Sequence, residues 1–474
     1  MFVIKREWKI NFFHSIFEVI LHMPQNNDTI CALATPNAIG AIAIIRVSGT
    51  DAKQKTELFF SKKLSEKASH TVHFGLFKSQ KGETIDEVLI SVFDSGKSFT
   101  GEESVEISCH ASPYIQQQIL ENLVSADCRL AEPGEFTKRA FMNGKLDLSQ
   151  AEAVADLIAS QSKQAHQIAL RQLRGNFSHE LHDLREKLIH FASLIELELD
   201  FAEEDVEFAD RTQLKALVAE VLQIVKRLAQ SFALGNALKN GVPVAIVGAP
   251  NTGKSTLLNQ LLGEDRAIVS NIAGTTRDVI EETLNIDGIL FRLIDTAGIR
   301  ETTETIEALG IKRSQQKIEQ ASIVLCMADA SNPENVAQVQ SWQKELIKLH
   351  PDKEVLLVLN KVDINSIEIE NSIAISAKIG LGIDQLKSKL VELIIGTFDL
   401  QNETIVANAR HHEALLKTAS ALEKAQYDLD NGTTGDFIAM DIREAMRQLG
   451  NITGEIQIDK DLLGNIFSKF CIGK

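Results

Sequence analysis

Residues 248–255 of this chain read Gly248-Ala249-Pro250-Asn251-Thr252-Gly253-Lys254-Ser255, and this stretch decides the fold. It fits the spacing G-x-x-x-x-G-K-[ST], follows the apolar segment Val244–Val247 and precedes the helical pattern that begins at Thr256. In such a loop the glycines let backbone N–H groups turn towards phosphate oxygens, and the start of the helix adds partial positive charge. We expect Lys254 to reach the β and γ phosphates of a nucleotide and Ser255 to bind Mg²⁺.

Two later motifs predict which base this nucleotide carries. Asn360-Lys361-Val362-Asp363 follows the apolar run Val355–Leu359, and an Asp there can accept two hydrogen bonds from the amino and imino edge of guanine. Adenine offers no such pair of donors, so a buried carboxylate would be left unpaired. Ser376-Ala377-Lys378 follows another apolar run and would close the pocket over the base. The sequence therefore predicts a site for a guanine nucleotide.

Two further segments would complete the site around the γ-phosphate. Asp295-Thr296-Ala297-Gly298 ends the apolar strand Leu290–Ile294, where the carboxylate can hold the metal through its water shell and the Gly298 amide can meet the phosphate. In Ala273-Gly274-Thr275-Thr276-Arg277-Asp278 the Thr276 hydroxyl can bind Mg²⁺ only when a γ-phosphate is present. Ile299 stands where many signalling GTPases carry the Gln that orients water. Hydrolysis then needs another group, and a slow or inactive hydrolase is the alternative.

The pattern of apolar and polar residues changes three times along the chain, which predicts a multidomain protein. Strand-length apolar runs with interspersed helices predict an α+β domain at 24–143, after an extension at 1–23; the runs are Ala41–Ile45, Val72–Phe77, Val88–Phe93 and Val105–Ile107. Helical periodicity follows at 144–239, strands alternating with helices at 240–399, and helices again at 400–474. That order predicts a parallel α/β domain inserted into an all-α domain, whose two halves pack together.

Composition narrows the class of protein further. Apolar residues make up 44% and charged residues 24% of the 474, which is typical of globular proteins. The net charge of −16 repels a polyanion, so any contact with nucleic acid must be local or shared with a partner. Five scattered Cys without C-x-x-C spacing predict neither a disulfide framework nor a zinc site, and favour a reducing compartment. With no signal peptide and no run of about 20 apolar residues, we expect a cytoplasmic protein that contacts no membrane.

Three weaker sequence signals each allow two interpretations when they are considered one at a time. Cys471, close to Lys474, is either a low-pKa nucleophile or a packing residue. The segment Phe99-Thr100-Gly101-Glu102-Glu103, with Glu106 and His110 beyond it, is either a binding loop or a plain turn. Arg46, after an apolar strand, is either functional or a solvated strand end.

Together these signals make the chain similar to a known family. From Asp28 to Lys474 it resembles the bacterial tRNA modification GTPases called MnmE or TrmE. The matching blocks, besides the nucleotide motifs, are Asp28-Thr29-Ile30, Ile45-Arg46-Val47-Ser48-Gly49, Ser98-Phe99-Thr100-Gly101-Glu102, Pro133-Gly134-Glu135-Phe136-Thr137-Lys138-Arg139-Ala140-Phe141, Lys145-Leu146-Asp147-Leu148 and Cys471-Ile472-Gly473-Lys474.

The resemblance implies both an architecture and a reaction. It implies a folate-binding N-terminal domain that dimerises, a helical domain, and an inserted Ras-like G domain that hydrolyses GTP. It also implies a heterotetramer with an FAD- and NADH-dependent partner, MnmG (GidA). Together the two proteins would add a carboxymethylaminomethyl or aminomethyl group to carbon 5 of the tRNA wobble uridine. The carbon would come from methylene- or formyl-tetrahydrofolate.

The resemblance also assigns roles to matching positions. Folate would be contacted by Arg46, Glu106, Lys145 and Lys474, a mixed set that suits glutamate carboxylates and a pterin edge. Mg²⁺ would be held by Ser255 and Thr276, and K⁺ by Asn251, Ser270, Ile272 and Thr275, with Ser270 standing where the family has Thr. The K⁺ would stand where an arginine finger otherwise does. Glu307 would position the hydrolytic water.

The complete predicted sets follow from the motifs and the resemblance together. The catalytic set is Glu307, Lys254, Asn251, Thr276 and Cys471. The GTP-binding set is Asn251, Thr252, Gly253, Lys254, Ser255, Thr256, Ser270, Asn271, Ile272, Ala273, Gly274, Thr275, Thr276, Asp295, Thr296, Ala297, Gly298, Asn360, Lys361, Asp363, Ser376 and Ala377. Arg277 and Arg300 are candidates for switch or dimer contacts.

One rival function belongs to a different class of protein. Related G domains serve in ribosome assembly as nucleotide-regulated binding switches without performing chemistry. Such a factor is expected to carry a compact RNA-binding module rich in Lys and Arg, and this acidic sequence shows none. The tRNA-modifying reading is therefore the one we favour.

Overall fold

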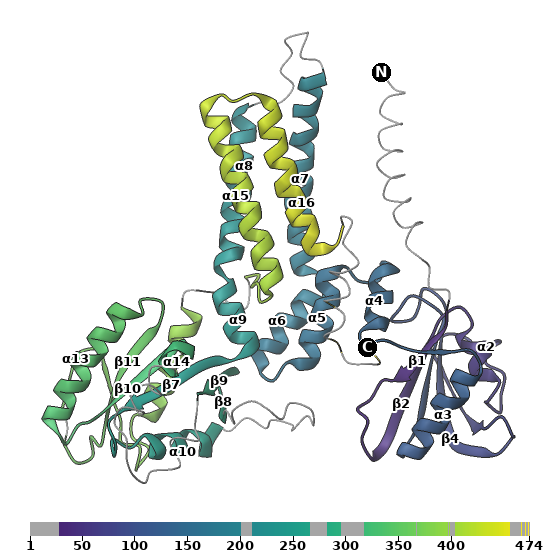
Figure 1. Cartoon of the computed structure of the whole chain (residues 1–474), viewed down its shortest axis with the longest axis horizontal. Helices are drawn as coiled ribbons and strands as arrows, with labels where there is room; N and C mark the ends of the chain where they lie inside the picture. Colours follow the sequence, from purple (N-terminus) through teal and green to yellow (C-terminus); the bar gives the residue numbers. More distant parts are fainter. Residues whose placement is uncertain are drawn as a thin grey trace. The chain divides into compact units, whose positions relative to one another are not determined.

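The computed structural model describes residues 28–200, 211–265, 282–294, 317–365, 367–396, 398, 403–455, 466, 470 and 473 (Figure 1). It divides into two compact units, one of residues 1–155 with 449–474 and one of residues 156–448. The α+β, helical and α/β domains predicted from the sequence are all present.

The first unit is built on a six-stranded sheet with the order β3-β4-β5-β2-β1-β6. Its strands are β1 (Ile30–Leu33), β2 (Gly40–Ser48), β3 (Thr71–Lys78), β4 (Thr84–Phe93), β5 (Ser104–Ala111) and β6 (Arg129–Leu130). Its helices include α2 (Ala52–Glu57), α3 (Pro113–Ser125) and α4 (Glu135–Met142). Neighbouring strands are antiparallel except β1 and β6, which are parallel. The apolar runs predicted as strands fall within β2 to β5, so that prediction is confirmed.

The two faces of this sheet differ in what covers them. On one face the apolar side chains of β2, β4 and β5 are buried in a core that includes Ala52 of α2 and Ile119 of α3. On the other face Phe136 of α4 packs against Ile30 and Ala32 of β1. The rest of that second face exposes apolar side chains, which the strand registers place together; they are Ile42, Val72, Phe74 and Leu89.

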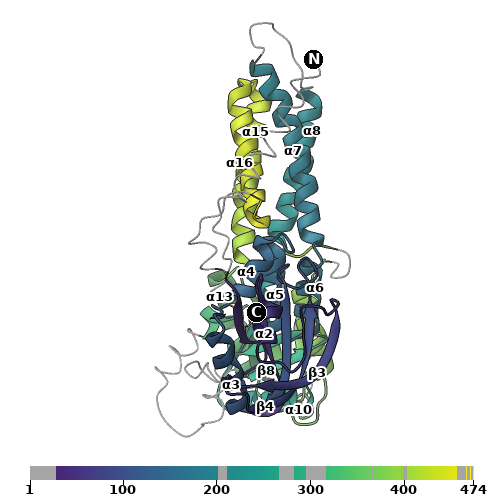
Figure 2. The same cartoon turned by 90° about the vertical axis from the view of Figure 1, so that its right-hand side faces the viewer.

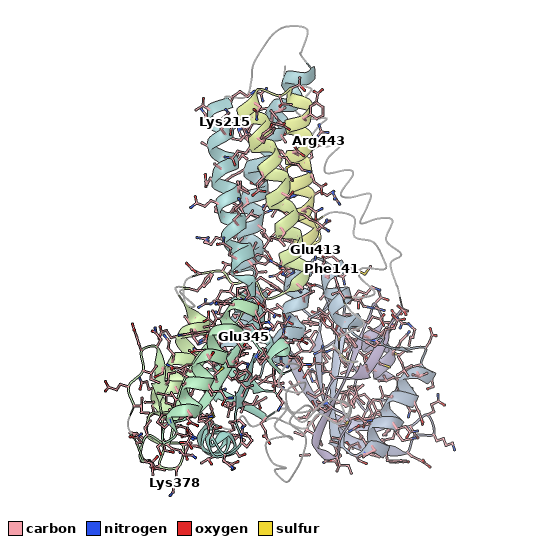
Figure 3. All side chains as sticks on the ribbon, turned by 60° about the vertical axis from the view of Figure 1, so that its left-hand side comes forward. Phe141, Lys215, Glu345, Lys378, Glu413 and Arg443 are labelled. Atoms are coloured by element: carbon pink, nitrogen blue, oxygen red, sulfur yellow. The ribbon has the colours of Figure 1, made fainter. Side chains whose placement is uncertain are left out.

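Long helices lie side by side in the second unit (Figures 1 and 2). The helices are α6 (Lys163–Leu173), α7 (Asn176–Asp200), α8 (Arg211–Gln230), α9 (Phe232–Asn240), α15 (Ala409–Asn431) and α16 (Gly435–Thr453), preceded by α5 (Leu148–Ala159). Ion pairs Lys215–Asp430 (3.0 Å) and Lys226–Glu423 (2.6 Å) join α8 to α15 across the inserted segment. Lys215, Glu413 and Arg443 mark this bundle in Figure 3. The two helical halves therefore pack together as predicted.

A second six-stranded sheet forms the α/β domain, with the order β12-β11-β10-β7-β9-β8. Its strands are β7 (Val242–Gly248), β8 (Glu282–Ile286), β9 (Ile289–Leu293), β10 (Ile323–Asp329), β11 (Glu354–Asn360) and β12 (Ser372–Ala374). Its helices include α10 (Lys254–Asp265), α13 (Pro333–Leu349) and α14 (Ile383–Ile395). Separate apolar cores cover the two faces, one with α10 and α14 and the other with α13.

One strand departs from the predicted parallel sheet. β8 pairs antiparallel with β9, whereas the other neighbours in this sheet are parallel. The cause is the two-residue turn Asp287-Gly288, whose φ angles of 51° and 82° are both positive. Asp-Gly between apolar runs is a hairpin signal. The prediction of a parallel α/β sheet is confirmed by the other strand pairs, and the Asp-Gly signal for this one antiparallel hairpin was present in the sequence.

Candidate functional site

The glycine loop joins β7 to α10 with the backbone that its sequence predicts. Asn251 and Gly253 have positive φ angles of 63° and 97°. A Cβ on Gly253 would lie 2.2 Å from Nδ2 of Asn360, so this position requires glycine. Lys254 to Thr256 then form the first turn of α10, where backbone N–H groups have no partner within the helix. The loop and helix start are therefore arranged for an anion.

Lys254 folds back over this loop. Its Nζ donates to the carbonyl oxygens of Gly248 (2.9 Å) and Ala249 (2.8 Å). Burial, followed by the positive charge of Lys317, lowers the pKa of Lys254. Both causes disfavour the ammonium form, and a phosphate beside Nζ would counter them with negative charge.

Asn360 ties the phosphate loop to the segments expected around the base. Its Nδ2 donates to the Thr252 carbonyl at 2.8 Å, and its Oδ1 accepts from the Ala377 amide at 2.9 Å. Asn360, Thr252 and Ala377 are all buried. One side chain thus fixes three separate motifs at the carboxyl ends of β7, β11 and β12, where open α/β sheets bind ligands.

Lys361 is held by Asp329, a residue at the end of the neighbouring strand β10 that sequence reasoning did not single out. Its backbone has a φ of 69°, and its Nζ donates to Oδ2 of Asp329 at 2.5 Å. Burial raises the pKa of Asp329, but hydrogen bonds from Lys361 and Ser331 outweigh it, so that pKa lies below its usual value. The sequence signal for this contact was the acidic residue Asp329 at the end of β10. That strand lies beside β11, after which the Asn-Lys-x-Asp motif begins.

The remaining described members of the predicted base site follow β11 and β12. Asp363 is exposed after β11, where it can meet a base. Ser376 bridges to Leu381, and its buried hydroxyl has no hydrogen-bond partner within the part of the chain that is described. Lys378 is exposed and points away from the domain in Figure 3.

Much of the γ-phosphate side lies outside the described residues. This holds for the predicted positions Ser270, Asn271, Ile272, Ala273, Gly274, Thr275, Thr276, Arg277, Asp295, Thr296, Ala297, Gly298, Ile299, Arg300 and Glu307. Asn251 and Ser255 are the described members of the predicted ion sites.

A second constellation lies on the sheet of the first unit. Arg46 of β2 stands opposite Glu106 of β5, and its Nε and Nη2 both bond to Oε1 of Glu106, at 3.0 and 2.9 Å. The Arg46 guanidinium also lies over the rings of Phe99 and Phe136, 5.5 and 5.6 Å from their centroids. Sequence reasoning named the Phe99 segment as a possible binding loop but gave neither ring a role, although each falls within a matching block.

Lys145 reaches the loop that carries Phe99. Its Nζ donates to the Gly96 carbonyl at 3.0 Å. A Cβ on Gly101, whose φ is +81°, would lie 3.1 Å from Cγ of Lys145. Three of the predicted folate positions, Arg46, Glu106 and Lys145, therefore adjoin one loop. His110 does not join them and bonds to Asp86 at 2.7 Å.

The end of the chain packs onto the same unit. A Cβ on Gly473 would lie 2.1 Å from the carbonyl oxygen of Leu33, so the Gly473 backbone is pressed against the end of β1. Ala32, the neighbour of Leu33, pairs with Arg46. Cys471 and Lys474 lie outside the described residues.

A buried network of ion pairs centred on Arg139 holds the loop that carries Phe99. The Arg139 side chain, 6% exposed, bonds to Asp28 (2.7 Å), Glu102 (3.1 Å) and Glu135 (3.0 Å). Burial raises the pKa of Glu135 and of Asp28, but bonds from Arg129 and Arg139 outweigh it and leave both pKa values low. The charged network therefore fixes Glu102, which ends the loop.

The described part of the chain holds neither a cluster of metal ligands nor a membrane-spanning helix. No group of three or more His, Cys, Asp or Glu side chains there could hold a metal ion. None of the helices described is long and apolar enough to cross a membrane. The described cysteines are buried thiols, and burial raises the pKa of Cys109 to about 11 and of Cys326 to about 12.

The sheet, the glycine loop and the Asn360 bridge together define a P-loop domain of the guanine-nucleotide-binding class. Two family models match the chain: "GTP-binding protein TrmE N-terminus" at residues 29–145 and "MnmE helical domain" at residues 148–471. A tRNA modification GTPase MnmE of Christiangramia forsetii is 53% identical, over 94% of this chain and 99% of that protein. The protein of the same name from Flavobacterium johnsoniae is 52% identical, over 95% and 100%. Among solved structures, the G domain of the T. maritima FeoB iron transporter is 27% identical over 32% of this chain and 97% of that one, with a TM-score of 0.24.

The chain belongs to the MnmE, or TrmE, family of tRNA modification GTPases. It is accordingly a GTP-hydrolysing enzyme, and that activity implies Mg²⁺ beside GTP.

Proposed function

We propose that the chain uses GTP hydrolysis to drive modification of the tRNA wobble uridine, together with an FAD- and NADH-dependent partner of the MnmG (GidA) kind. The product would carry a carboxymethylaminomethyl or aminomethyl group at carbon 5. When bound, methylene- or formyl-tetrahydrofolate supplies the one-carbon unit. The domains proposed for this work are residues 24–143 for folate, 144–239 with 400–474 for the helical domain, and 240–399 for GTP.

The Arg46–Glu106 ion pair is the observation that best supports folate binding by the N-terminal domain. Both guanidinium nitrogens bond to Oε1, so Oε2 of Glu106 has no partner among the residues that the structure describes. The pterin of a folate has an N–H and an amino group side by side, and a carboxylate can accept from both. Arg46 holds that carboxylate in place through the two bonds to Oε1. Glu106 would thus orient the pterin ring.

The other proposed folate contacts are cationic. Lys145 is 3.0 Å from a carbonyl of the loop beside Arg46, and Gly473 brings the chain end to β1. Lys474 follows directly in sequence. Ammonium groups there would pair with the glutamate carboxylates of folate. Cys471, two residues before Gly473 in sequence, would act as a nucleophile.

GTP hydrolysis would use the loop and the segments after it. The amides of the glycine loop and Lys254 would bind the phosphates, with Ser255 and Thr276 on Mg²⁺. Glu307 would position the attacking water in place of the Gln that Ile299 replaces. Asp363 would accept the hydrogen bonds that select guanine.

A K⁺ ion would supply the charge that an arginine finger provides elsewhere. Its proposed ligands are Asn251, Ser270, Ile272 and Thr275. Asn251 is exposed in the glycine loop and has a φ of 63°. GTP turnover should be faster in K⁺ than in Na⁺, and equal rates would remove this role.

The uncovered sheet face supports a homodimer through the N-terminal domain. Ile42, Val72, Phe74 and Leu89 are between 47% and 68% exposed on one face. Contiguous exposed apolar side chains are typical of protein interfaces. A heterotetramer with the flavoprotein would then hold two copies of each chain, working on tRNA in the cytoplasm.

A reconstituted reaction tests the proposal as a whole. The purified chain, its flavoprotein partner with FAD and NADH, tRNA, GTP, methylene-tetrahydrofolate and either glycine or ammonium as the amine are combined, and the wobble nucleoside is identified by mass spectrometry. We expect the modified uridine with the complete mixture and none when the folate or GTP is left out. Product without folate would refute the proposed carbon source.

A further inference from the structure

One exposed aromatic ring stands among the proposed folate contacts. We propose that Phe99 is the surface on which the flat pterin ring stacks, an inference that rests on the folate-binding function proposed above. Phe99 is 39% exposed, whereas its neighbours Ser98 and Thr100 are 7% and 0% exposed. The turn thus buries two hydroxyl residues and presents the phenyl ring between them.

Hydrogen bonds on both sides hold this ring in place. Ser98 Oγ donates to the Glu102 carbonyl at 2.6 Å, and Thr100 Oγ1 bonds to Ser48 Oγ at 2.7 Å. Nδ2 of Asn143 donates to the Thr100 carbonyl at 2.8 Å. Because the loop is already ordered, little conformational entropy is left to lose when a ligand binds.

The surroundings of Phe99 favour a flat ligand that also hydrogen bonds. Its ring lies 5.5 Å from the Arg46 guanidinium, and Arg46 holds Glu106, the proposed reader of the pterin edge. Lys145 packs beside Gly101 of the same loop. A ring stacked on Phe99 would therefore have a carboxylate and two cations close to its rim.

The ring is not needed merely to cover Arg46. Phe136 is fully buried and already lies over the same guanidinium at 5.6 Å. The second ring, Phe99, is 39% exposed and so adds aromatic surface that a ligand can reach. Aromatic faces stack flat heterocycles irrespective of their hydrogen-bonding edge, which is left for Glu106 to read.

Calorimetric titration with 5-formyltetrahydrofolate, a stable reduced folate, tests this role. Phe99→Leu and Phe99→Met should each raise Kd roughly ten- to a hundredfold, because stacking on an aromatic side chain contributes a factor of that order. Phe99→Trp should keep the affinity. The matched control is Tyr114→Leu, a ring 69% exposed on α3 of the same unit, which should leave Kd unchanged.

A second probe separates stacking from a general disturbance of the site. A tetrahydropterin without the benzoylglutamate tail should lose affinity by the same factor in Phe99→Leu. Wild-type affinity in both non-aromatic variants, or a loss seen only with the complete folate, would overturn the inference while the folate function stands. Failure of the unmodified protein to bind folate would refute the folate function and this inference with it.

Discussion

The nucleotide loop and the Arg46–Glu106 site were assembled by the chain in opposite ways. The loop is one run of eight residues between a strand and a helix, and its geometry follows from its own glycines. The other site combines Arg46, Phe99, Glu106, Phe136 and Lys145, drawn from two strands, a loop, a helix and the segment after it. Local motifs can therefore be read from sequence, whereas sites built by strand pairing need the fold.

The support beneath the two sites differs as well. Backbone carbonyls and one bridging amide, Asn360, hold the nucleotide loop. A buried network of charges centred on Arg139 holds the other. Buried charges lose more when a partner is removed than neutral groups do. Substitutions in the two regions test this contrast between neutral and charged support.

Lys254→Ala should abolish most GTP turnover and leave the first unit intact. Removing a charged donor from developing phosphate charge costs about 10²- to 10³-fold in rate. Phosphate release measures turnover, and calorimetry with 5-formyltetrahydrofolate measures the other site, whose Kd should not change. Lys348→Ala, at an exposed lysine in the last turn of α13, is the control and should hydrolyse GTP normally. Loss of folate binding in Lys254→Ala would contradict the independence of the sites.

Arg139→Met should destabilise the first unit by about 3–5 kcal/mol, because Asp28, Glu102 and Glu135 would keep their charges without their partner. Hydrogen exchange of the β1 and α4 amides reports the opening free energy locally. Arg447→Met, which breaks an exposed pair with Glu444, should cost no more than about 1 kcal/mol. Equal effects in the two variants would show that burial of the network adds nothing.

The same network predicts a loss of stability in acid. The folded-state pKa values of Asp28 and Glu135 lie below their usual values, so the unfolded chain binds protons more readily. Their stabilisation is complete above the unfolded pKa values and is lost as the pH falls through the folded ones, below about pH 5. Hydrogen-exchange rates of the β1 and α4 amides at pH 7 and pH 4, corrected for intrinsic rates, measure this loss of stability. The loss of stability between pH 7 and pH 4 should be smaller in Arg139→Met than in the unmodified protein. An equal loss in the two proteins would exclude this network as its source.

Asn360→Ala should weaken GDP binding about tenfold, since buried groups of Thr252 and Ala377 would lose their partner. Titration with a fluorescent GDP measures Kd. Asn365→Ala, an exposed amide in the following turn, serves as the control. An unchanged Kd would mean that the three motifs hold their places without the bridge.

Asp329→Asn should have the smallest effect, a rise of roughly two- to fivefold in the Kd for GDP, because partly exposed ion pairs contribute little. Adding Lys361→Ala to it should cost no more than Lys361→Ala alone, since both changes remove one interaction. Additive losses would show that Asp329 acts by another route.

The sequence predicted most of the fold for identifiable reasons. Strand–glycine–helix spacing placed β7, the loop and α10, and apolar periodicity placed the helical halves on either side of the insertion. The antiparallel β8 was missed although Asp287-Gly288 signals a hairpin. The rings of Phe99 and Phe136 over Arg46 could not be foreseen, because they depend on strand register and on how α4 lies on β1.

The central claim is that both sites serve one reaction on tRNA. Nucleoside analysis of tRNA from a strain that lacks the gene tests it, with complementation by the unmodified gene, by Lys254→Ala and by Glu106→Gln. The account predicts that the wobble modification disappears on deletion and returns only with the unmodified gene. A normal wobble nucleoside in the deletion strain, or full restoration by either variant, would contradict it.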